Sequence, residues 1–448
     1  MKPSRLTRRQ FVAATSVGTV ATVAGATAAK ASVRRAPSPL AVHGGKPVRS
    51  AGFSRWPLWD RQHDEAQVLE VLRSGVWSRS HVVAEFEKRY AELIGTKRCL
   101  ATTNGTMALV TALNALEIGV GDEVLVGPYT FVATLDAIFL AGALPIMVDT
   151  DPETFQVNPD RMEAKITPRT RAILPVHIYG LPADMDRINA LARKHDLLVV
   201  EDACQAWLAE WKGKKCGALG DLGCFSFQNS KHLTCGEGGA LLGDDDRVMN
   251  RAFSYHDFGR PYQETERWPS GNVRLGTKCR MAEFQAAILL AQMTRLEEQT
   301  RRRWENANYL TSKLQGIPGI TPHKLYDGVT RAAYHIYPLR YHEDEFGGVS
   351  RARFLEALRA EGIPCSGGYG RLNREPFFEN TLNSRNFQRM YSRAQLDHCR
   401  EMNECPDNDA LCEQAVCLFQ NLLLGTREDM DDIADAVVKV YEHREQLA

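Results

Sequence analysis

One lysine in this chain stands between an apolar segment and a glycine-rich turn. Residues 223–246 read GCFSFQNSKHLTCGEGGALLGDDD, so Lys231 follows the apolar run CFSF, which carries Ser226. An amine beyond the end of a buried strand could form a Schiff base with an aldehyde, and the glycines of GEGG allow a ligand to approach the backbone closely. Most lysines are solvated surface groups, so a chemical role depends on what other segments bring to Lys231.

A second candidate is the acidic pair that ends the apolar run LLVVEDACQA. Glu201 and Asp202 leave a hydrophobic strand, where a carboxylate is costly unless it meets a cation or a hydrogen-bond donor. A protonated ring nitrogen would be such a partner. By itself, Asp202 is better explained as the N-cap of a following helix.

A third candidate is the segment TTNGTMAL, residues 102–109. A glycine and a hydroxyl residue at a helix start leave backbone N–H groups free, and the helix dipole favours an anion, so this turn could hold a phosphate. A plain N-cap would have the same sequence. Pyridoxal phosphate (PLP) needs an amine, a carboxylate at its ring nitrogen, a phosphate cradle and an aromatic face. The chain offers Lys231, Asp202, Gly105 and Thr106 with Ser226, and the rings of PYTF at 128–131.

Strand and helix patterns alternate from about residue 99 to residue 246. Short apolar runs such as DEVLVGP, LPIMVDT and LLVVEDA are typical of buried strands, and TMALVTALNALEIG and ADMDRINALARKHD have the three- and four-residue spacing of helices. The alternation predicts a mostly parallel sheet with helices on both faces. Ligands of such sheets bind beyond the carboxyl ends of the strands.

The remaining sequence predicts a second, smaller domain. A long helical stretch that begins near Met281 leads to the strand-like AAYHIYPLRY, a helix with Ser350 as its N-cap, and a terminal amphipathic helix. We therefore expect a large α/β domain over residues 44–300 and a small α+β domain over residues 301–448.

The bulk composition excludes several classes of protein. Lys plus Arg and Asp plus Glu number 55 each, so no strong field is available to attract nucleic acid or an anionic membrane. The eleven cysteines include no C-x-x-C pair, and the late group beside His398 fits no common metal-ligand spacing. Beyond the leader, no run is long and apolar enough to span a bilayer. We expect no metal, no nucleic-acid partner and no membrane span.

The first 31 residues have the pattern of a leader. Arg8 and Arg9 precede Phe11, a modestly apolar run follows, and the sequence around Lys30 has the A-x-A form of a cleavage site. The paired arginines resemble a twin-arginine signal, whose pathway exports proteins that have already folded. We expect a signal segment over residues 1–31 and export, with a disordered basic leader as the alternative.

The chain resembles the DegT/DnrJ/EryC1/StrS family of sugar and cyclitol aminotransferases. The likeness runs from about Gly44 to the C-terminus through SGVWSR, TTNGTMAL, GDEVLVGPYTFVATLDAI, EDACQA, FSFQNSKHLTCGEGGAL and RMAEFQAAILLAQ, in that order. The resemblance implies fold type I of the PLP-dependent transferases, the aspartate-aminotransferase fold. It also implies a homodimer in which each subunit contributes to the partner's active site.

The resemblance further implies roles for individual residues. Lys231 would form the internal aldimine and later shuttle the proton, and Asp202 would pair with the pyridinium nitrogen. The other implied cofactor contacts are Gln205 near the ring hydroxyl, Phe131 stacked on the ring, and Gly105, Thr106, the Met107 amide and Ser226 at the phosphate.

One position departs from the family pattern. The segment GTKCRM has Lys278 where the family usually has an asparagine that reaches the partner's cofactor phosphate. A lysine could bind that phosphate as a point charge, or it could compete as a second amine for the aldehyde.

The residues and the resemblance together predict an aminotransferase that moves an amino group from glutamate or glutamine to a keto-sugar or keto-cyclitol by a ping-pong mechanism. Two alternatives stay open. AVHGGKPVR and WSR are reminiscent of the aminohydroxybenzoate-forming branch, whose members act as lyases or dehydratases. A protein that binds PLP without catalysis is the other alternative, and it is favoured by the leader, since activated keto sugars are made in the cytoplasm.

Overall fold

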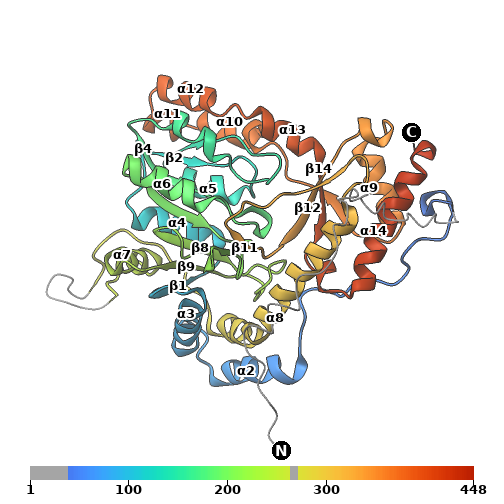
Figure 1. Cartoon of the computed structure of the whole chain (residues 1–448). Helices are drawn as coiled ribbons and strands as arrows, with labels where there is room; N and C mark the ends of the chain where they lie inside the picture. The colour runs from blue at the N-terminus through green and yellow to red at the C-terminus, as the bar shows by residue number, and fades with distance from the viewer. Residues whose placement is uncertain (1–38, 263–270, 448) are drawn as a thin grey trace, which may run out of the picture. The chain divides into compact units, whose positions relative to one another are not determined.

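The structure of the chain, a computed structural model, describes residues 39–262 and 271–447 (Figure 1). The expected leader, residues 1–31, lies outside the described residues. No described helix is both long and apolar enough to cross a membrane.

The largest of the three sheets in the described structure has seven strands. Its strands lie in the order β1-β9-β8-β5-β4-β2-β3; the neighbours from β8 to β3 are parallel, and β9 is antiparallel to both β8 and β1. This confirms the predicted mostly parallel α/β sheet. The strands are β1 Arg98–Thr102, β2 Glu123–Val126, β3 Leu144–Met147, β4 Thr170–Leu174, β5 Leu198–Asp202, β8 Leu222–Ser226 and β9 Gly239–Gly243.

Helices cover both faces of this sheet, as Figure 1 shows. Alternate residues of a strand point to opposite faces. Cys224 packs with the helix α4 side of the sheet, and Phe225 meets Tyr90 of α3 on the other side, with ring centroids 5.3 Å apart. The helices around the sheet are α2 Arg61–Ser74, α3 His81–Ile94, α4 Gly105–Ala115, α5 Ala133–Ala141, α6 Met185–His195 and α7 Asp246–His256.

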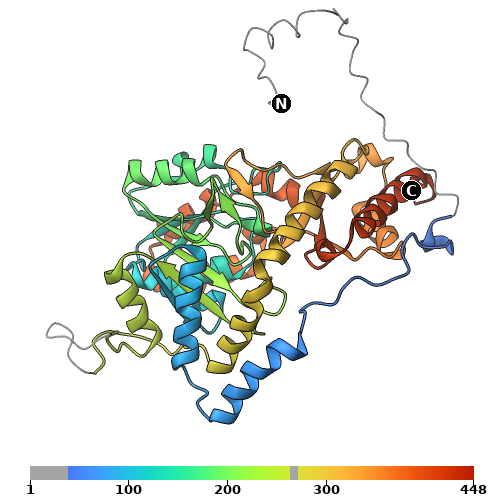
Figure 2. The ribbon, with the colours of Figure 1, turned by 60° about the horizontal axis from the view of Figure 1, so that its bottom comes forward.

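The long helix α8, Glu283–Leu314, connects the large sheet to a second, antiparallel sheet (Figure 2). The second sheet has the order β10-β12-β14-β13, and a small third sheet has the order β11-β6-β7. The predicted domain boundary at residues 300 and 301 falls inside α8, and the division itself stays a prediction. The strands are β6 Glu210–Trp211, β7 Lys214–Lys215, β10 Ile320–Pro322, β11 Val329–Arg331, β12 Ile336–Tyr341, β13 Cys365–Gly367 and β14 Ala415–Phe419.

Helices of the C-terminal part of the chain contact the seven-stranded sheet and the four-stranded sheet. Ser350 accepts a hydrogen bond from the Arg353 amide, which confirms it as the N-cap of α9. The terminal amphipathic helix is α14, and its buried residues pack in the core. These helices are α9 Arg351–Ala360, α10 Pro376–Leu382, α11 Phe387–Met390, α12 Arg393–Met402, α13 Pro406–Gln414 and α14 Arg427–Glu442.

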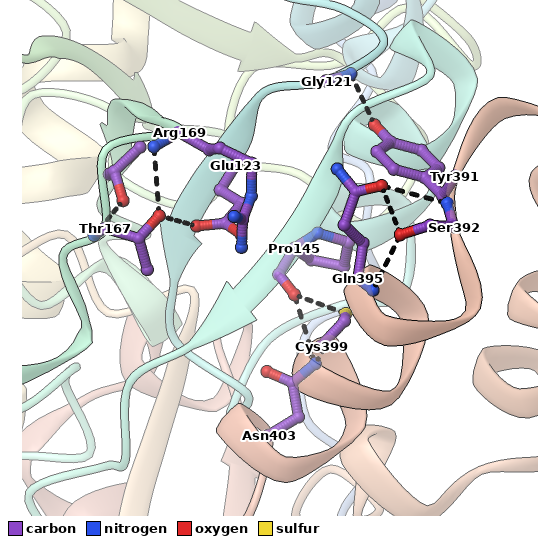
Figure 3. Close-up of polar contacts among 11 residues, drawn as sticks. Gly121, Glu123, Pro145, Thr167, Arg169, Tyr391, Ser392, Gln395, Cys399 and Asn403 are labelled. Atoms are coloured by element: carbon purple, nitrogen blue, oxygen red, sulfur yellow. Dashed lines mark hydrogen bonds and ion pairs between the residues drawn. The ribbon is translucent and has the colours of Figure 1, made fainter.

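The residue after α12 covers the edge strand β3 of the large sheet (Figure 3). The Asn403 side chain donates to the Pro145 carbonyl at 3.1 Å and accepts from the Met147 amide at 2.5 Å. Nearby, Tyr391 donates its hydroxyl to the Gly142 carbonyl. An unpaired edge strand invites pairing with another chain, so an amide side chain that takes the place of a neighbouring strand protects this edge.

Candidate active site

Lys231 lies in the loop that follows β8, close to the carboxyl ends of the parallel strands. Its amide donates to the Gln228 carbonyl at 2.9 Å, which closes a turn before the lysine. The partly buried side chain extends over Trp207, with 5.8 Å between Nζ and the ring centroid. Burial lowers the pKa of the Lys231 amine, and the nearby Cys204 and Asp202 oppose this shift. Within the described ranges, the amine has no hydrogen-bond or ion-pair partner.

Asp202 ends β5 as a buried carboxylate. One oxygen accepts from the Thr134 hydroxyl at 2.8 Å, and the other accepts from the Cys204 amide at 3.1 Å. In the described structure the element after Asp202 is the strand β6 and not a helix, so the expectation of a helix N-cap was wrong: the side chain holds a turn instead. Among the described residues, no cation pairs with this carboxylate. A buried acid without a cation is costly, which favours a cationic group from outside the chain.

Beneath Asp202, its neighbour Glu201 is fully buried in a complete hydrogen-bond network. His177 donates from Nε2 to Glu201 at 2.8 Å, and its Nδ1 accepts from the Ala183 amide, so the imidazole is neutral in this arrangement. Three amides also donate to the Glu201 carboxylate at 2.6–2.7 Å, namely Gly217, Leu219 and Gly220. The network fixes the end of β5 and thereby the position of Asp202.

Replacing Glu201 with alanine is expected to lower the free energy of unfolding by about 3–5 kcal/mol, because four donors lose their acceptor in a buried site. Urea unfolding of the cofactor-free protein, followed by circular dichroism, measures this change. Glu163→Ala is the matched control, since Glu163 is exposed and its ion pairs with Lys194 and His195 lie at the surface. Equal unfolding midpoints for the two variants would contradict the structural role of Glu201.

The start of α4, the predicted phosphate cradle, lies beside Ser226. Within the described ranges, the amides of Gly105 and Thr106 have no acceptor, as expected at a helix N-terminus. A Cβ on Gly105 would lie 2.8 Å from the Ser226 Cβ, so only glycine lets the helix approach the strand end this closely. The Met107 amide, the third predicted phosphate contact at this helix start, donates to the N-cap side chain of Asn104 at 2.8 Å. Its contact with phosphate stays a prediction.

The glycine-rich turn after Lys231 packs against this same cradle. A Cβ on Gly239 would lie 2.3 Å from the Asn104 carbonyl oxygen, and one on Gly238 would crowd the Cys235 sulfur at 2.7 Å. Gly239 therefore lets the chain approach the backbone that begins α4, and Gly238 leaves room for the side chains packed around the turn. Close approach to a ligand, the use considered from the sequence, is not needed to explain them.

The other predicted residues have different surroundings. Phe131 is 57% exposed one turn before Thr134, so its ring is free to cover a flat ligand bound near Asp202. Gln205 accepts from the Tyr179 amide and donates to the Tyr369 hydroxyl, at 2.8 and 3.0 Å. Its side chain therefore supports Tyr179, whose φ of 61° is unfavourable for a residue other than glycine.

Lys278 is exposed, and its backbone pairs with Asp257 in an isolated bridge. Within residues 39–262 and 271–447, no hydrogen bond or ion pair engages its ammonium group. The structure thus brings Lys231, Asp202 and Ser226 to one edge of the sheet, whereas Lys278 is free to contact another molecule.

Several residues of the site were not identified from the sequence. Thr134 orients Asp202, and Trp207 lies under the lysine amine. His232 and His335 pack on Trp207 at ring distances of 5.3 and 6.0 Å, and burial lowers the pKa of both well below its usual value, so both are neutral. In the sequence, only the position of His232 directly after Lys231 indicated that this histidine belongs to the site.

Comparison with known proteins agrees with this geometry. The sequence profile of the DegT/DnrJ/EryC1/StrS aminotransferase family matches residues 59–437. The chain is 35% identical over 428 residues to the L-glutamine:2-deoxy-scyllo-inosose aminotransferase of Streptomyces kanamyceticus, covering 92% of this chain and 99% of that protein.

Two solved structures are similar over most of the chain. The aminotransferase from Psychrobacter cryohalolentis has a TM-score of 0.78 and 29% identity, covering 88% of this chain and 100% of that one. The 3-amino-5-hydroxybenzoic acid synthase has a TM-score of 0.77 and 30% identity, covering 87% of this chain and 98% of that one.

Proposed function

Because the chain belongs to the DegT/DnrJ/EryC1/StrS aminotransferase family, we propose that it transfers the amino group of L-glutamine to the keto group of an inosose, a keto-cyclitol. The relative from Streptomyces kanamyceticus carries both substrates in its name and matches this chain over nearly its whole length. The observation that carries the proposal is the Lys231 amine at the same sheet edge as the buried Asp202 carboxylate, neither of which has an ion-pair partner among the residues that the structure describes.

The residues of this edge fit PLP as the cofactor. Lys231 would be its covalent anchor, Phe131 would cover the ring, and the free amides of Gly105 and Thr106 would hold the phosphate together with Ser226. When bound, PLP supplies an aldehyde that condenses with amines and a ring that withdraws electrons from the neighbouring carbon.

The protein contributes proton transfer and orientation to this reaction. When it is not holding the cofactor, Lys231 would be a free amine able to carry a proton, and its lowered pKa favours the neutral form that accepts one. Asp202, oriented by Thr134, would keep a proton on the ring nitrogen through its negative charge. The reverse sequence on the keto-cyclitol would return the lysine to its anchored state.

The direct test is product analysis with L-glutamine and 2-deoxy-scyllo-inosose, each omitted in turn. An amino-cyclitol that forms only when both are present, with parallel lines in double-reciprocal plots, is the expected result. Consumption of the keto-cyclitol without glutamine would support the dehydratase alternative, for which the similarity to 3-amino-5-hydroxybenzoic acid synthase is the relevant observation. No turnover with any donor would support the non-catalytic alternative.

We also propose a homodimer in which Lys278 reaches the cofactor phosphate of the partner subunit. Its exposure and its free ammonium group support this role. Lys278→Ala is expected to raise the PLP concentration for half-saturation about 10-fold, because one charge-assisted hydrogen bond is lost. Lys278→Asn, which installs the usual family residue, should restore most of the affinity. An unchanged affinity in Lys278→Ala, measured on the dimer fraction, would rule the contact out.

Export through the leader is a further part of the proposal. Fractionation of the tagged full-length protein tests it, with Arg8 and Arg9 both changed to lysine as the control. Processed protein outside the cytoplasm in the wild type alone is expected. An unprocessed cytoplasmic protein in both cases would remove the export proposal.

A further inference from the structure

Two side chains from remote parts of the chain hold the backbone at Lys231. The indole Nε1 of Trp56, which precedes α2, donates to the Lys231 carbonyl at 3.1 Å. The amide Nε2 of Gln420, which follows β14, donates to the Ser230 carbonyl at 3.4 Å. The carbonyls of Ser230 and Lys231, which flank the Lys231 Cα, are thus held by side chains from outside their own loop.

Arg303 of α8 joins these two donors. Its Nε and Nη2 both donate to the Gln420 side-chain oxygen, the former at 2.9 Å. Its guanidinium carbon lies 5.0 Å from the centroid of the Trp56 ring, a cation–π arrangement. Arg303 is fully buried, and burial lowers its pKa to about 9, so the group is still charged at neutral pH.

A buried guanidinium is expensive without an acidic partner. In the described part of the chain no carboxylate pairs with Arg303, and its Nη1 has no acceptor. Its positive charge polarises the Gln420 amide, which strengthens the hydrogen bond from that amide to Ser230. In the described structure no hydrogen bond joins Arg303 or Gln420 to the Lys231 amine, so this arrangement acts on the lysine through its backbone.

We propose that Trp56, Gln420 and Arg303 are positioning residues: they hold the backbone of Lys231 in place and so orient its amine toward the reacting carbon. The inference rests on the proposed role of Lys231 as anchor and proton carrier. A lysine side chain is a flexible four-carbon stem, so its amine is well placed only if the backbone beneath it is fixed. A misplacement of about 1 Å in an active site can cost about 100-fold in rate.

The most informative variant is Trp56→Phe, which keeps an aromatic ring against Arg303 and removes the N–H donor together with part of the ring system. The first measurement is acetylation of Lys231 by acetic anhydride as a function of pH, in the full-length protein freed of cofactor and read by mass spectrometry, with exposed Lys88 as the internal standard. In wild type, Lys231 should react at lower pH than Lys88, because its pKa is lowered by burial. In Trp56→Phe the Lys231 profile should move toward that of Lys88.

The second measurement is turnover with L-glutamine, where Trp56→Phe should lose about 10-fold in kcat with little change in KM. Trp59→Phe is the matched control, since Trp59 is 48% exposed and should behave as wild type in both measurements. Gln420→Glu, which keeps the acceptor for Arg303 and removes the donor to Ser230, should reproduce the effects of Trp56→Phe even if the latter fails to fold.

A wild-type Lys231 acetylation profile in folded Trp56→Phe and Gln420→Glu would overturn the positioning role. The acetylation profile needs neither cofactor nor turnover. It therefore tests whether these residues position Lys231 even if the protein transfers no amino group. The positioning role and the proposed aminotransferase activity can thus fail separately.

Discussion

Replacing Lys231 with alanine is expected to abolish amino transfer, with a loss of at least about 10⁴-fold in the half-reaction with L-glutamine. The change removes both the anchor for the cofactor and the only amine at this sheet edge that is placed to carry the proton, among the residues that the structure describes. The measurement is single-turnover formation of the 2-oxo acid from glutamine, together with the visible absorption of protein loaded with PLP. The absorption band of the wild type should be absent or shifted in the variant.

Two further variants separate the roles of Lys231. Lys231→Arg keeps a positive charge but offers no neutral amine, so it should be as inactive as Lys231→Ala. Lys88→Ala, a change at an exposed lysine of α3, should leave the rate unchanged. Rapid 2-oxo acid formation by Lys231→Ala would mean that another group, with Lys278 the first candidate, supplies the amine.

Asp202→Asn is the second change with a large expected effect, a fall of about 10²- to 10³-fold in kcat/KM. Asparagine has nearly the same shape, and its oxygen can still accept from Thr134 or from the Cys204 amide, so the turn after β5 should be retained. What is lost is the negative charge that would keep a proton on the cofactor ring. Steady-state kinetics with glutamine and the keto-cyclitol measure the fall.

Stability gives an independent check on the same residue. The carboxylate of Asp202 is buried without a cation in the described chain, so removing its charge should leave the cofactor-free protein as stable as wild type or more stable. Thr134→Val, which removes only the hydroxyl that orients the carboxylate, should cost far less activity than Asp202→Asn. An Asp202→Asn variant that is active but unstable would show that the carboxylate is structural.

The sequence was informative where local pattern decides structure. The strand ends at Ser226 and Asp202 and the helix start at Gly105 follow from apolar runs and cap chemistry, and the parallel topology then places them at one edge of the sheet. The requirements of PLP and the resemblance to a known family together indicated the chemistry of Lys231. Each of these strand ends and helix starts is decided by residues close to it in the sequence.

The parts that were missed depend on contacts between distant segments. Nothing in the surroundings of Trp56, Arg303 or Gln420 in the sequence indicates that they meet under the lysine, because each belongs to a different element. The helix cap expected at Asp202 failed for a related reason: the Ala203 amide donates to the Cys224 carbonyl of the neighbouring strand β8, and the Thr134 hydroxyl donates to the Asp202 carboxylate, so no helix starts there. Tertiary hydrogen bonds outweighed local propensity there.

The amide of Asn403 that completes the edge of β3 has a consequence for synthesis. Met147 and Asn403 are 256 residues apart, so the ribosome makes the edge strand long before it makes the residue that covers it. At the usual elongation speed of about 5–20 residues per second, the strand waits roughly 13–50 s for its cover. The nascent chain is therefore exposed to faulty pairing for more than half of its production, and the edge of β3 is covered only once Asn403, 45 residues before the end of the 448-residue chain, has emerged.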